Sequence, residues 1–237
     1  MAASLFLLTR FNGSNMKGVF ITGTDTDAGK TVISTAIVDV IKNKGFRVAG
    51  MKPIASGCDV TAEGLRNDDA MQLIEHANVE LPYELVNPYS FEPAIAPHIA
   101  AEQVQTEIDL NLIYEKYQEI QQSCDAVVVE GAGGWLVPIN NSQTMADLAK
   151  LLSLPVVLVV GIRLGCINHA LLSVEVIKQS GLPFLGWVAN NVEVNRESAQ
   201  IISTLRNTIS APLLGEVPYL SDMTKIAVDY INGEHFV

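Results

Sequence analysis

Residues 23 to 31 read Gly23-Thr-Asp-Thr-Asp-Ala-Gly-Lys-Thr31, and this stretch decides the fold class. An apolar run, Gly18-Val-Phe-Ile21, precedes it, and a helical pattern of apolar residues from Val32 to Ile41 follows. The order strand, glycine loop, helix is typical of a loop whose backbone N–H groups surround phosphate at the positive end of a helix. Gly23 and Gly29 enclose five residues, so this is a longer variant of the usual phosphate loop.

Two side chains at the end of the loop carry the expected chemistry. Lys30 adds a positive charge for the β- and γ-phosphates of a nucleotide, and Thr31 offers a hydroxyl to Mg²⁺. The alternative is a chance Gly-Lys-Thr in a turn. The flanking strand and helix patterns argue against that alternative.

Composition excludes several classes of protein. The chain has 237 residues, of which 49% are hydrophobic and 17% charged, which predicts a large, well-buried α/β core rather than disorder. A formal net charge of −11 argues against nucleic acid or an anionic membrane as a partner. The cysteines at 58, 124 and 166 have no metal-site or paired spacing, which favours reduced thiols in a cytoplasmic protein. No apolar run reaches transmembrane length.

Strand-like apolar runs alternate with segments of helical period along the chain. The predicted strands are 18–22, 46–51, 126–129, 155–161, 184–190 and 213–217. The predicted helices are 30–44, 109–122, 143–152, 167–180, 195–209 and a short one at 222–232, with helical patches at 68–77 and 95–103 in a long polar stretch, 53–108. Continuous rather than alternating apolar strands predict a doubly wound α/β fold of the P-loop NTPase type, in which helices cover both faces of a mostly parallel sheet.

The ends of the chain suggest its domain organisation. Residues 1–15 are read as a disordered extension, and Met16 is a possible alternative start. They contain only a four-residue apolar block and one arginine, too little for a signal peptide. Residues 16–237 then form one P-loop-type domain.

Charged residues follow two predicted strands at the sheet edge where ligands bind. Lys52 follows the second strand, and with Ser56 nearby it can meet a γ-phosphate or an anionic substrate. Glu130 closes the strand 126–129 and precedes Gly131, Ala132 and Gly133. A carboxylate there is typical of an Mg²⁺-organising acid. The alternative for Lys52 is a solvated surface lysine. The alternative for Glu130 is an acid at the sheet edge before a turn, and the sequence favours neither interpretation of Glu130 over the other.

The remaining candidates allow several interpretations. Asp68 and Asp69 open a helical pattern, where we expect one to cap the helix and the other to be free for a metal. Asn168 is expected as the N-cap of the helix 167–180. Amide and turn residues close the last two strands: Asn190, Asn191, Pro218, Tyr219 and Leu220. They can bind an adenine ring, and turn chemistry explains them equally well.

With these pieces in place, the chain closely resembles the dethiobiotin synthetases from about Met16 to Leu220. The matching segments are Thr22-Gly-Thr-Asp-Thr-Asp-Ala-Gly-Lys-Thr31, Lys52-Pro-Ile-Ala-Ser-Gly57, Gly64-Leu-Arg-Asn-Asp-Asp69, Val86-Asn-Pro-Tyr89, Val129-Glu-Gly-Ala-Gly-Gly-Trp135, Leu164-Gly-Cys-Ile-Asn-His-Ala170, Gly186-Trp-Val-Ala-Asn190 and Pro212-Leu-Leu-Gly-Glu-Val-Pro218. One such segment is weak evidence, whereas all of them in this order are strong evidence.

The resemblance implies a reaction. Members of this family convert 7,8-diaminononanoate, CO₂ and MgATP into dethiobiotin, ADP and phosphate in biotin biosynthesis. One amine captures CO₂ as a carbamate, and a carbamate oxygen attacks the γ-phosphate to give a carbamic–phosphoric anhydride. The second amine then closes the ring. The resemblance also implies a homodimer with its site at the subunit interface.

The resemblance also implies a role for each matching residue. Phosphate and nucleotide contacts fall on Thr26, Asp27, Ala28, Gly29, Lys30, Thr31, Val32, Asp69, Glu130, Gly131, Ala132, Gly133, Asn190, Asn191, Pro218, Tyr219 and Leu220. Thr31, Asp69 and Glu130 match the magnesium positions, and Lys52, with Lys30, matches the catalytic lysines. Ser56 matches a substrate contact, and Gly165, Cys166, Ile167 and Asn168 match the segment that holds the substrate carboxylate from the opposite subunit.

Two other classes share such a loop. A partitioning ATPase of the ParA/MinD kind is a nucleotide-switched dimer that binds partners. Its loop carries an extra lysine four residues before the second glycine, where this chain has Asp25, and residues 221–237 contain one lysine and no basic amphipathic helix. A cobyrinate amidase would bring a second, glutaminase-like domain, for which the chain has no room.

Overall fold

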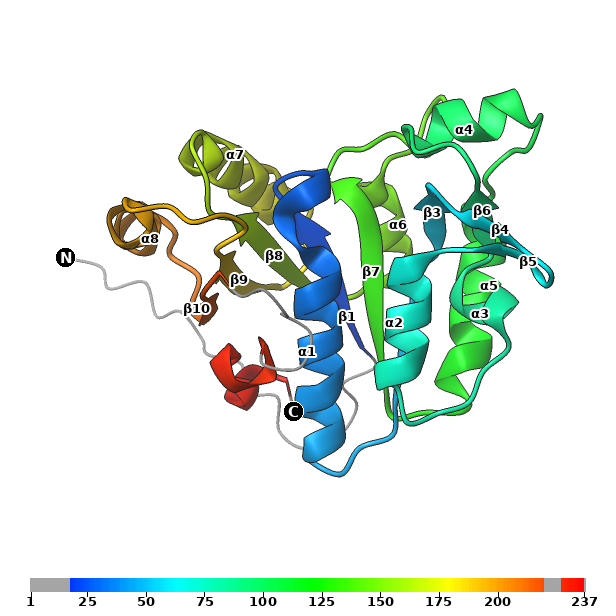
Figure 1. Cartoon of the computed structure of the whole chain (residues 1–237), viewed down its shortest axis with the longest axis horizontal. Coiled ribbons are helices and arrows are strands. Elements are labelled where there is room, and N and C mark those ends of the chain that lie inside the picture. Colours follow the sequence, from blue (N-terminus) through cyan, green and yellow to red (C-terminus); the bar gives the residue numbers. More distant parts are fainter. Residues whose placement is uncertain (1–17, 220–226, 237) are drawn as a thin grey trace.

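The computed structural model describes residues 18–219 and 227–236, and within these ranges six strands form one parallel sheet. Their spatial order is β10-β9-β8-β1-β7-β2. The strands are β1 (Gly18–Gly23), β2 (Val48–Met51), β7 (Ala126–Gly134), β8 (Val156–Gly161), β9 (Phe184–Asn190) and β10 (Leu213–Val217). Because β1 lies between β7 and β8, the loop that follows it emerges at the centre of the sheet edge (Figure 1).

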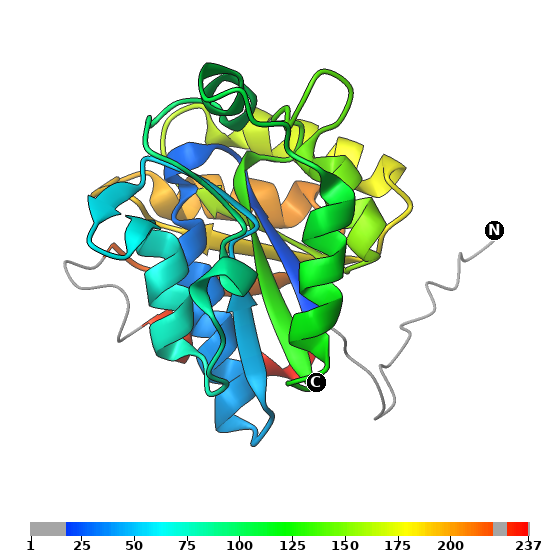
Figure 2. The same ribbon diagram turned by 90° about the vertical axis from the view of Figure 1, so that its right-hand side faces the viewer.

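Helices cover both faces of the sheet, which confirms the predicted doubly wound fold (Figures 1 and 2). α1 (Lys30–Asn43), α2 (Asp68–His76) and the C-terminal segment pack on one face. The other face is covered by α5 (Leu110–Gln121), α6 (Met145–Leu152), α7 (Cys166–Gln179) and α8 (Ser198–Thr208). The strands are therefore apolar on both sides.

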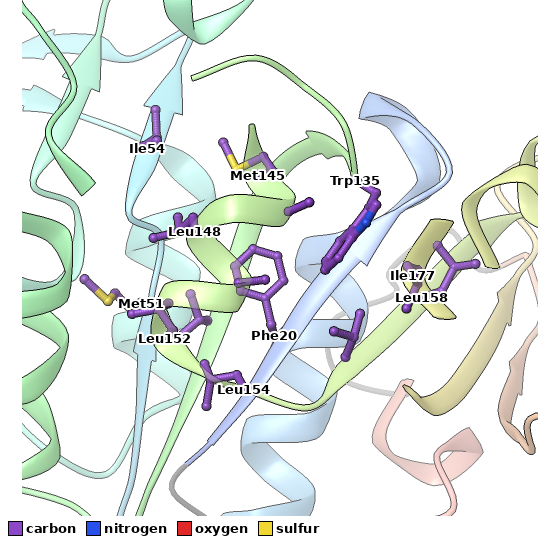
Figure 3. Close-up of a cluster of buried hydrophobic side chains, with 14 of the residues drawn as sticks. Phe20, Met51, Ile54, Trp135, Met145, Leu148, Leu152, Leu154, Leu158 and Ile177 are labelled. Carbon is purple, nitrogen blue, oxygen red and sulfur yellow. The ribbon is translucent and has the colours of Figure 1, made fainter. Parts of the chain in front are cut away.

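Successive residues of β1 divide between the two cores. Val19 and Ile21 pack against α1, whereas Phe20 points to the opposite side. There Phe20 meets Trp135 edge to face, with ring centroids 6.2 Å apart. Figure 3 shows Phe20 at the centre of a cluster to which α6 contributes Leu148. This packing fixes the strand from which the phosphate loop departs.

The polar stretch 53–108 contains more structure than the sequence predicts. Two expected helices are present, α2 and α4 (Pro97–Gln103). The stretch also contains a short helix, α3 (Tyr83–Val86), and two small sheets. The parallel pair is β3 (Ile54–Ser56) with β6 (Tyr89–Phe91), and the antiparallel pair is β4 (Asp59–Thr61) with β5 (Gly64–Arg66). Figure 1 shows these elements gathered beside α2 at one end of the sheet.

Several predicted boundaries are wrong. The second strand begins at Val48 rather than at 46, and β7 continues through Glu130 to Gly134, so the acid lies inside the strand. The short α-helix expected at 222–232 is not formed by the described part of that range, which contains a 3₁₀ turn, Ala227–Tyr230, and a bridge at Ile231 to Gly215.

Some predictions lie outside the described residues. These are the disordered extension 1–15, the alternative start at Met16 and the contact at Leu220. In the described part of the chain, no helix is long and apolar enough to cross a membrane.

Candidate active site

The phosphate loop begins where β1 ends at Gly23. A 3₁₀ turn, Thr26–Ala28, follows, and Gly29 then serves as the N-cap of α1 with φ of 80°. This left-handed conformation favours glycine and turns the chain directly into the helix. The first N–H groups of α1 therefore face the loop, as an anion site requires.

Neighbouring strands hold the loop in this shape. The Thr24 N–H donates to the Val159 carbonyl of β8 at 3.0 Å, and the Asn190 side-chain amide donates to the Ala28 carbonyl at 2.9 Å. A Cβ added to Gly29 would lie 2.1 Å from Nδ2 of Asn190. The loop is thus held closely against the ends of β8 and β9, so its amides are already oriented.

The Lys30 side chain curls back over the loop. Its Nζ donates to the carbonyl oxygens of Asp25 at 3.0 Å and Thr26 at 3.3 Å. Burial and the neighbouring Lys52 charge lower the pKa of Lys30 to about 8. Both causes disfavour the charged ammonium, so an anion bound at the loop would stabilise it.

Lys52 lies between two carboxylates. The register of β2 and β7 pairs Met51 with Val129, so the residues that follow, Lys52 and Glu130, meet at the same level. The Lys52 Nζ lies 2.6 Å from Oε1 of Glu130 and 2.7 Å from Oδ2 of Asp69. The sheet register therefore brings together Lys52 and Glu130, two residues that the sequence singled out.

The carboxylates keep Lys52 charged although its side chain is buried. Burial acts to lower the pKa of Lys52, but the attraction of Glu130 and Asp69 outweighs it and raises that pKa above its usual value. For Asp69, burial acts to raise the pKa, and the Lys52 charge outweighs it and lowers that pKa. The group is an ion triad at the floor of the site.

The Thr31 hydroxyl joins this triad. Its Oγ1 donates to Oε1 of Glu130 at 3.0 Å. The second carboxylate oxygen of Glu130 is buried without a hydrogen-bond partner in the described structure. Thr31, Asp69 and Glu130 thus converge as hard oxygen donors, which suits Mg²⁺. In the described ranges no group of three or more His, Cys, Asp or Glu side chains is placed to hold a metal.

The helix start of α2 corrects one prediction. Its N-cap is Asn67, whose Oδ1 accepts from the Ala70 N–H at 3.2 Å, so neither aspartate is the cap. Asp68 is exposed in the first turn, whereas Asp69 turns toward Lys52.

A cavity of about 780 Å³ opens above the triad and brings most candidates together. Predicted site residues that line it are Thr26, Asp27, Gly29, Lys30, Thr31, Lys52, Ser56, Asp69, Glu130, Ala132 and Gly133. The Ser56 hydroxyl is buried without a partner in the described structure. One wall is apolar, formed by Ala94, Ile95, Pro97 and Val137, and these residues were not predicted from the sequence.

Other candidates lie outside this cavity. Ala28 in the loop and Gly131 in β7 are buried, and Val32 is half-buried in α1. The Asn191 side chain donates to the Val217 carbonyl at 2.8 Å, and Tyr219 is 51% exposed. Asn190, Asn191, Pro218 and Tyr219 follow β9 and β10, on the β8 side of the loop.

The segment 165–168 also lies apart from the cavity. α7 begins at Cys166 with Gly165 as its N-cap at φ of 91°, so Asn168 lies inside the helix and is not the cap expected from the sequence. Cys166 is buried and Asn168 exposed.

One ion pair of the site was missed in the sequence. Arg163 follows β8 and binds Asp25 of the phosphate loop at 2.5 Å. The signal was present, because Arg163 follows a strand as Lys52 does.

Comparisons with known proteins agree with this geometry. The model of a family described as an AAA domain matches residues 17–227. Among solved structures, a chain of the MinC:MinD cell division protein complex of Aquifex aeolicus superimposes with a TM-score of 0.59 at 13% identity, covering 92% of this chain and 93% of that one. The signal recognition particle receptor FtsY of Elizabethkingia anophelis gives 0.52 at 13% identity, covering 94% and 64%. These likenesses show the P-loop fold alone.

Curated relatives are much closer in sequence. The ATP-dependent dethiobiotin synthetase BioD of Pseudomonas paraeruginosa is 47% identical over 215 residues, covering 90% of this chain and 94% of that protein. The protein of the same name from Vibrio vulnificus is 48% identical, covering 92% and 97%, and that from Cellvibrio japonicus 50% identical, covering 86% and 90%. Identity at this level over nearly the whole length shows the family, and the chain belongs to the dethiobiotin synthetases.

Proposed function

We propose that this protein catalyses ATP-dependent closure of 7,8-diaminononanoate and CO₂ to dethiobiotin, with release of ADP and phosphate. Membership of the family supports the reaction. The observation that carries the assignment of the site is the buried Lys52, 2.6 Å from Glu130 and 2.7 Å from Asp69, in a cavity that the phosphate loop also lines.

The reaction has to bring anions together. One substrate amine adds to CO₂, loses a proton and becomes a carbamate, which is repelled by the triphosphate. Lys30 from the loop and Lys52 from the end of β2 supply fixed positive charge on the walls of one cavity. Preorganised positive charge around a transferring phosphoryl group is the largest contribution that a protein makes to catalysis of phosphoryl transfer.

The steps then follow from position. With the triphosphate held by the loop amides and Lys30, a carbamate oxygen next to Lys52 attacks the γ-phosphorus and ADP leaves. The second amine attacks the carbonyl carbon of the mixed anhydride, and phosphate leaves as the ring closes. Holding several reactants in line lowers the entropic cost. No covalent enzyme nucleophile is needed.

Mg²⁺ fits the oxygen donors of the site. Thr31, Asp69 and Glu130 would hold it, and Oε2 of Glu130 is available for that purpose. When bound, the ion neutralises phosphate charge. Glu130→Gln should weaken the magnesium dependence of nucleotide binding, measured by titrating Mg²⁺ at fixed ATP after treatment with chelator.

The proposal includes a homodimer. The segment Gly165–Asn168 would hold the substrate carboxylate in the site of the other subunit, consistent with its absence from the lining of the cavity of its own chain. Exposed apolar side chains near this segment support a subunit interface here, because Leu164 is 96% and Leu172 59% exposed and exposed apolar surface marks sites of protein contact. With ATP as co-substrate, we expect the reaction in the cytoplasm.

Mass detection of dethiobiotin tests the function. Product should form from diaminononanoate, bicarbonate and MgATP, and omission of any one should abolish it. A nucleotide-switched ATPase would instead hydrolyse ATP without the diamine. That result, with no dethiobiotin formed, would contradict the proposal.

A further inference from the structure

An ion pair links the phosphate loop to the connection between β8 and α7. The guanidinium of Arg163 lies 2.5 Å from Oδ2 of Asp25, and the two side chains are 35% and 31% exposed. Asp25 has an extended backbone with φ of −164° immediately before the 3₁₀ turn of the loop. Arg163 comes shortly after β8, and its carbonyl accepts from the Cys166 N–H at 3.1 Å.

Arg163 faces an acidic edge of the loop. The hydrogen bond to Asp25 raises the pKa of Arg163, and the negative charges of Asp27 and Glu193 act in the same direction. The other carboxylate oxygen of Asp25, Oδ1, is buried and has no hydrogen-bond partner among the described residues. The Asp25 charge is therefore partly withdrawn from water, and Arg163 is the cation bound to it.

Lys30 lies beside the same residue. Its Nζ is 3.0 Å from the backbone carbonyl oxygen of Asp25. The negative charge of the Asp25 carboxylate also attracts the Lys30 ammonium. If this carboxylate lost its partner, it would compete with phosphate for the Lys30 ammonium. It would also repel the triphosphate, because like charges in a partly buried site are weakly screened.

We propose that Arg163 is a positioning residue for nucleotide binding, which neutralises Asp25 and so leaves Lys30 available for the phosphates. The inference rests on the proposed function in one respect, namely that Lys30 binds the β- and γ-phosphates. It adds a role for a residue that is not among those lining the cavity.

A purely mechanical role is the competing explanation. If the ion pair only ties the loop to β8, removing either partner should be equally harmful, and removing both should repair nothing. If Arg163 acts by neutralising Asp25, removing the arginine is harmful but removing both charges is not. A double-mutant cycle separates these cases.

The experiment compares Arg163→Met, Asp25→Asn, the double variant and Arg163→Lys. Affinity for MgATP is measured by calorimetry without the diamine, and KM for ATP and kcat are measured with it. The matched control is Arg206→Met, which removes an arginine from an exposed ion pair with Glu216 at 3.4 Å, on α8 and β10. Thermal melting checks that each variant is folded.

Arg163→Met should weaken MgATP binding about fivefold, with a larger effect on KM than on kcat, since the pair is partly exposed. Arg163→Lys, Asp25→Asn and the double variant should stay within about twofold of the unmodified protein. The Arg206→Met control should bind MgATP as tightly as the unmodified protein does.

Two results would overturn the inference. One is unchanged MgATP binding in Arg163→Met, and the other is a double variant that binds as poorly as Arg163→Met. The variant Lys30→Ala distinguishes a wrong role for Arg163 from a wrong assignment of the phosphate site. If Lys30→Ala binds MgATP normally, the phosphate site itself is misassigned, whereas if it loses binding and Arg163→Met does not, only the role of Arg163 is wrong.

Discussion

The Lys52 ammonium lies 2.6 Å from Oε1 of Glu130, and the Glu130 side chain is completely buried. Their meeting follows from the parallel register of β2 and β7, which pairs Met51 with Val129 one residue earlier. The same carboxylate oxygen accepts from the Thr31 hydroxyl at the start of α1. One buried acid therefore connects Lys52 to the phosphate loop.

Lys52→Met should lower kcat by roughly a hundredfold or more, because a charge aimed at the transferring group is lost. The control is Lys150→Met on α6, which removes an exposed lysine and should leave kcat unchanged. A Lys52→Met enzyme with normal kcat would remove this residue from the mechanism.

The same substitution should also affect stability. It leaves the buried Glu130 carboxylate without its cation, which costs about 3–5 kcal/mol in comparable pairs. The variant Lys52→Met with Glu130→Gln should regain most of the free energy of unfolding, measured in urea, without regaining activity. Parallel recovery of both quantities would show that Lys52 is only structural.

ATP binding should depend on pH through Lys30, whose pKa of about 8 lies below its ordinary value. Between about pH 8 and 10.5 the nucleotide-free protein holds fewer protons than the unfolded chain, so this residue makes the free protein more stable as pH rises. Bound phosphate favours the ammonium, so binding above pH 8 should take up a proton and weaken with pH.

Calorimetry at pH 9 in buffers of different ionisation enthalpy, with chelator present, measures this proton uptake. Lys30→Met should abolish it. Binding at pH 9 without proton uptake in the unmodified protein would contradict the environment assigned to Lys30.

Gly29→Ala should prevent nucleotide binding and destabilise the protein, because the new Cβ would lie 2.1 Å from Nδ2 of Asn190. Gly45→Ala is a matched control, since Gly45 also has a positive φ, 89°, but nothing lies within 4 Å of an added Cβ. It should cost only about 1 kcal/mol. Equal losses of thermal stability in the two variants would contradict the close packing of the loop.

A site shared between subunits predicts complementation. Lys52→Ala and Asn168→Ala should each be nearly inactive, and subunits mixed at equal ratio should regain about a quarter of the normal activity, since half of the dimers then contain one intact site. A verified heterodimer without activity would place the whole site in one chain. Full activity of Asn168→Ala alone would remove Asn168 from substrate binding.

The sequence predicted the fold and the floor of the site because both follow from the parallel sheet. Carboxyl ends of parallel strands meet at one edge, so a lysine after one strand and an acid at the end of another were expected together. Lys52 and Glu130 confirm that expectation. Arg163 was missed because its partner, Asp25, becomes its neighbour only through the sheet order β8-β1.

Local competition explains the other errors. At α7, Gly165 in a left-handed conformation starts the helix before Asn168 can cap it. At α2, Asn67 takes the capping position that an aspartate was expected to fill. The short strands β3 and β6 pair across a polar segment, and strands of three residues leave almost no periodic signal.

Oxygen transfer from CO₂ to phosphate tests the central claim, that the Lys30 and Lys52 cavity joins a carbamate to ATP. The reaction is run with diaminononanoate, MgATP and C¹⁸O₂ under single-turnover conditions, and the phosphate released is analysed by mass spectrometry. Attack by the carbamate oxygen predicts one ¹⁸O atom in each phosphate formed with dethiobiotin. Phosphate that contains oxygen from water and none from CO₂ would contradict the account.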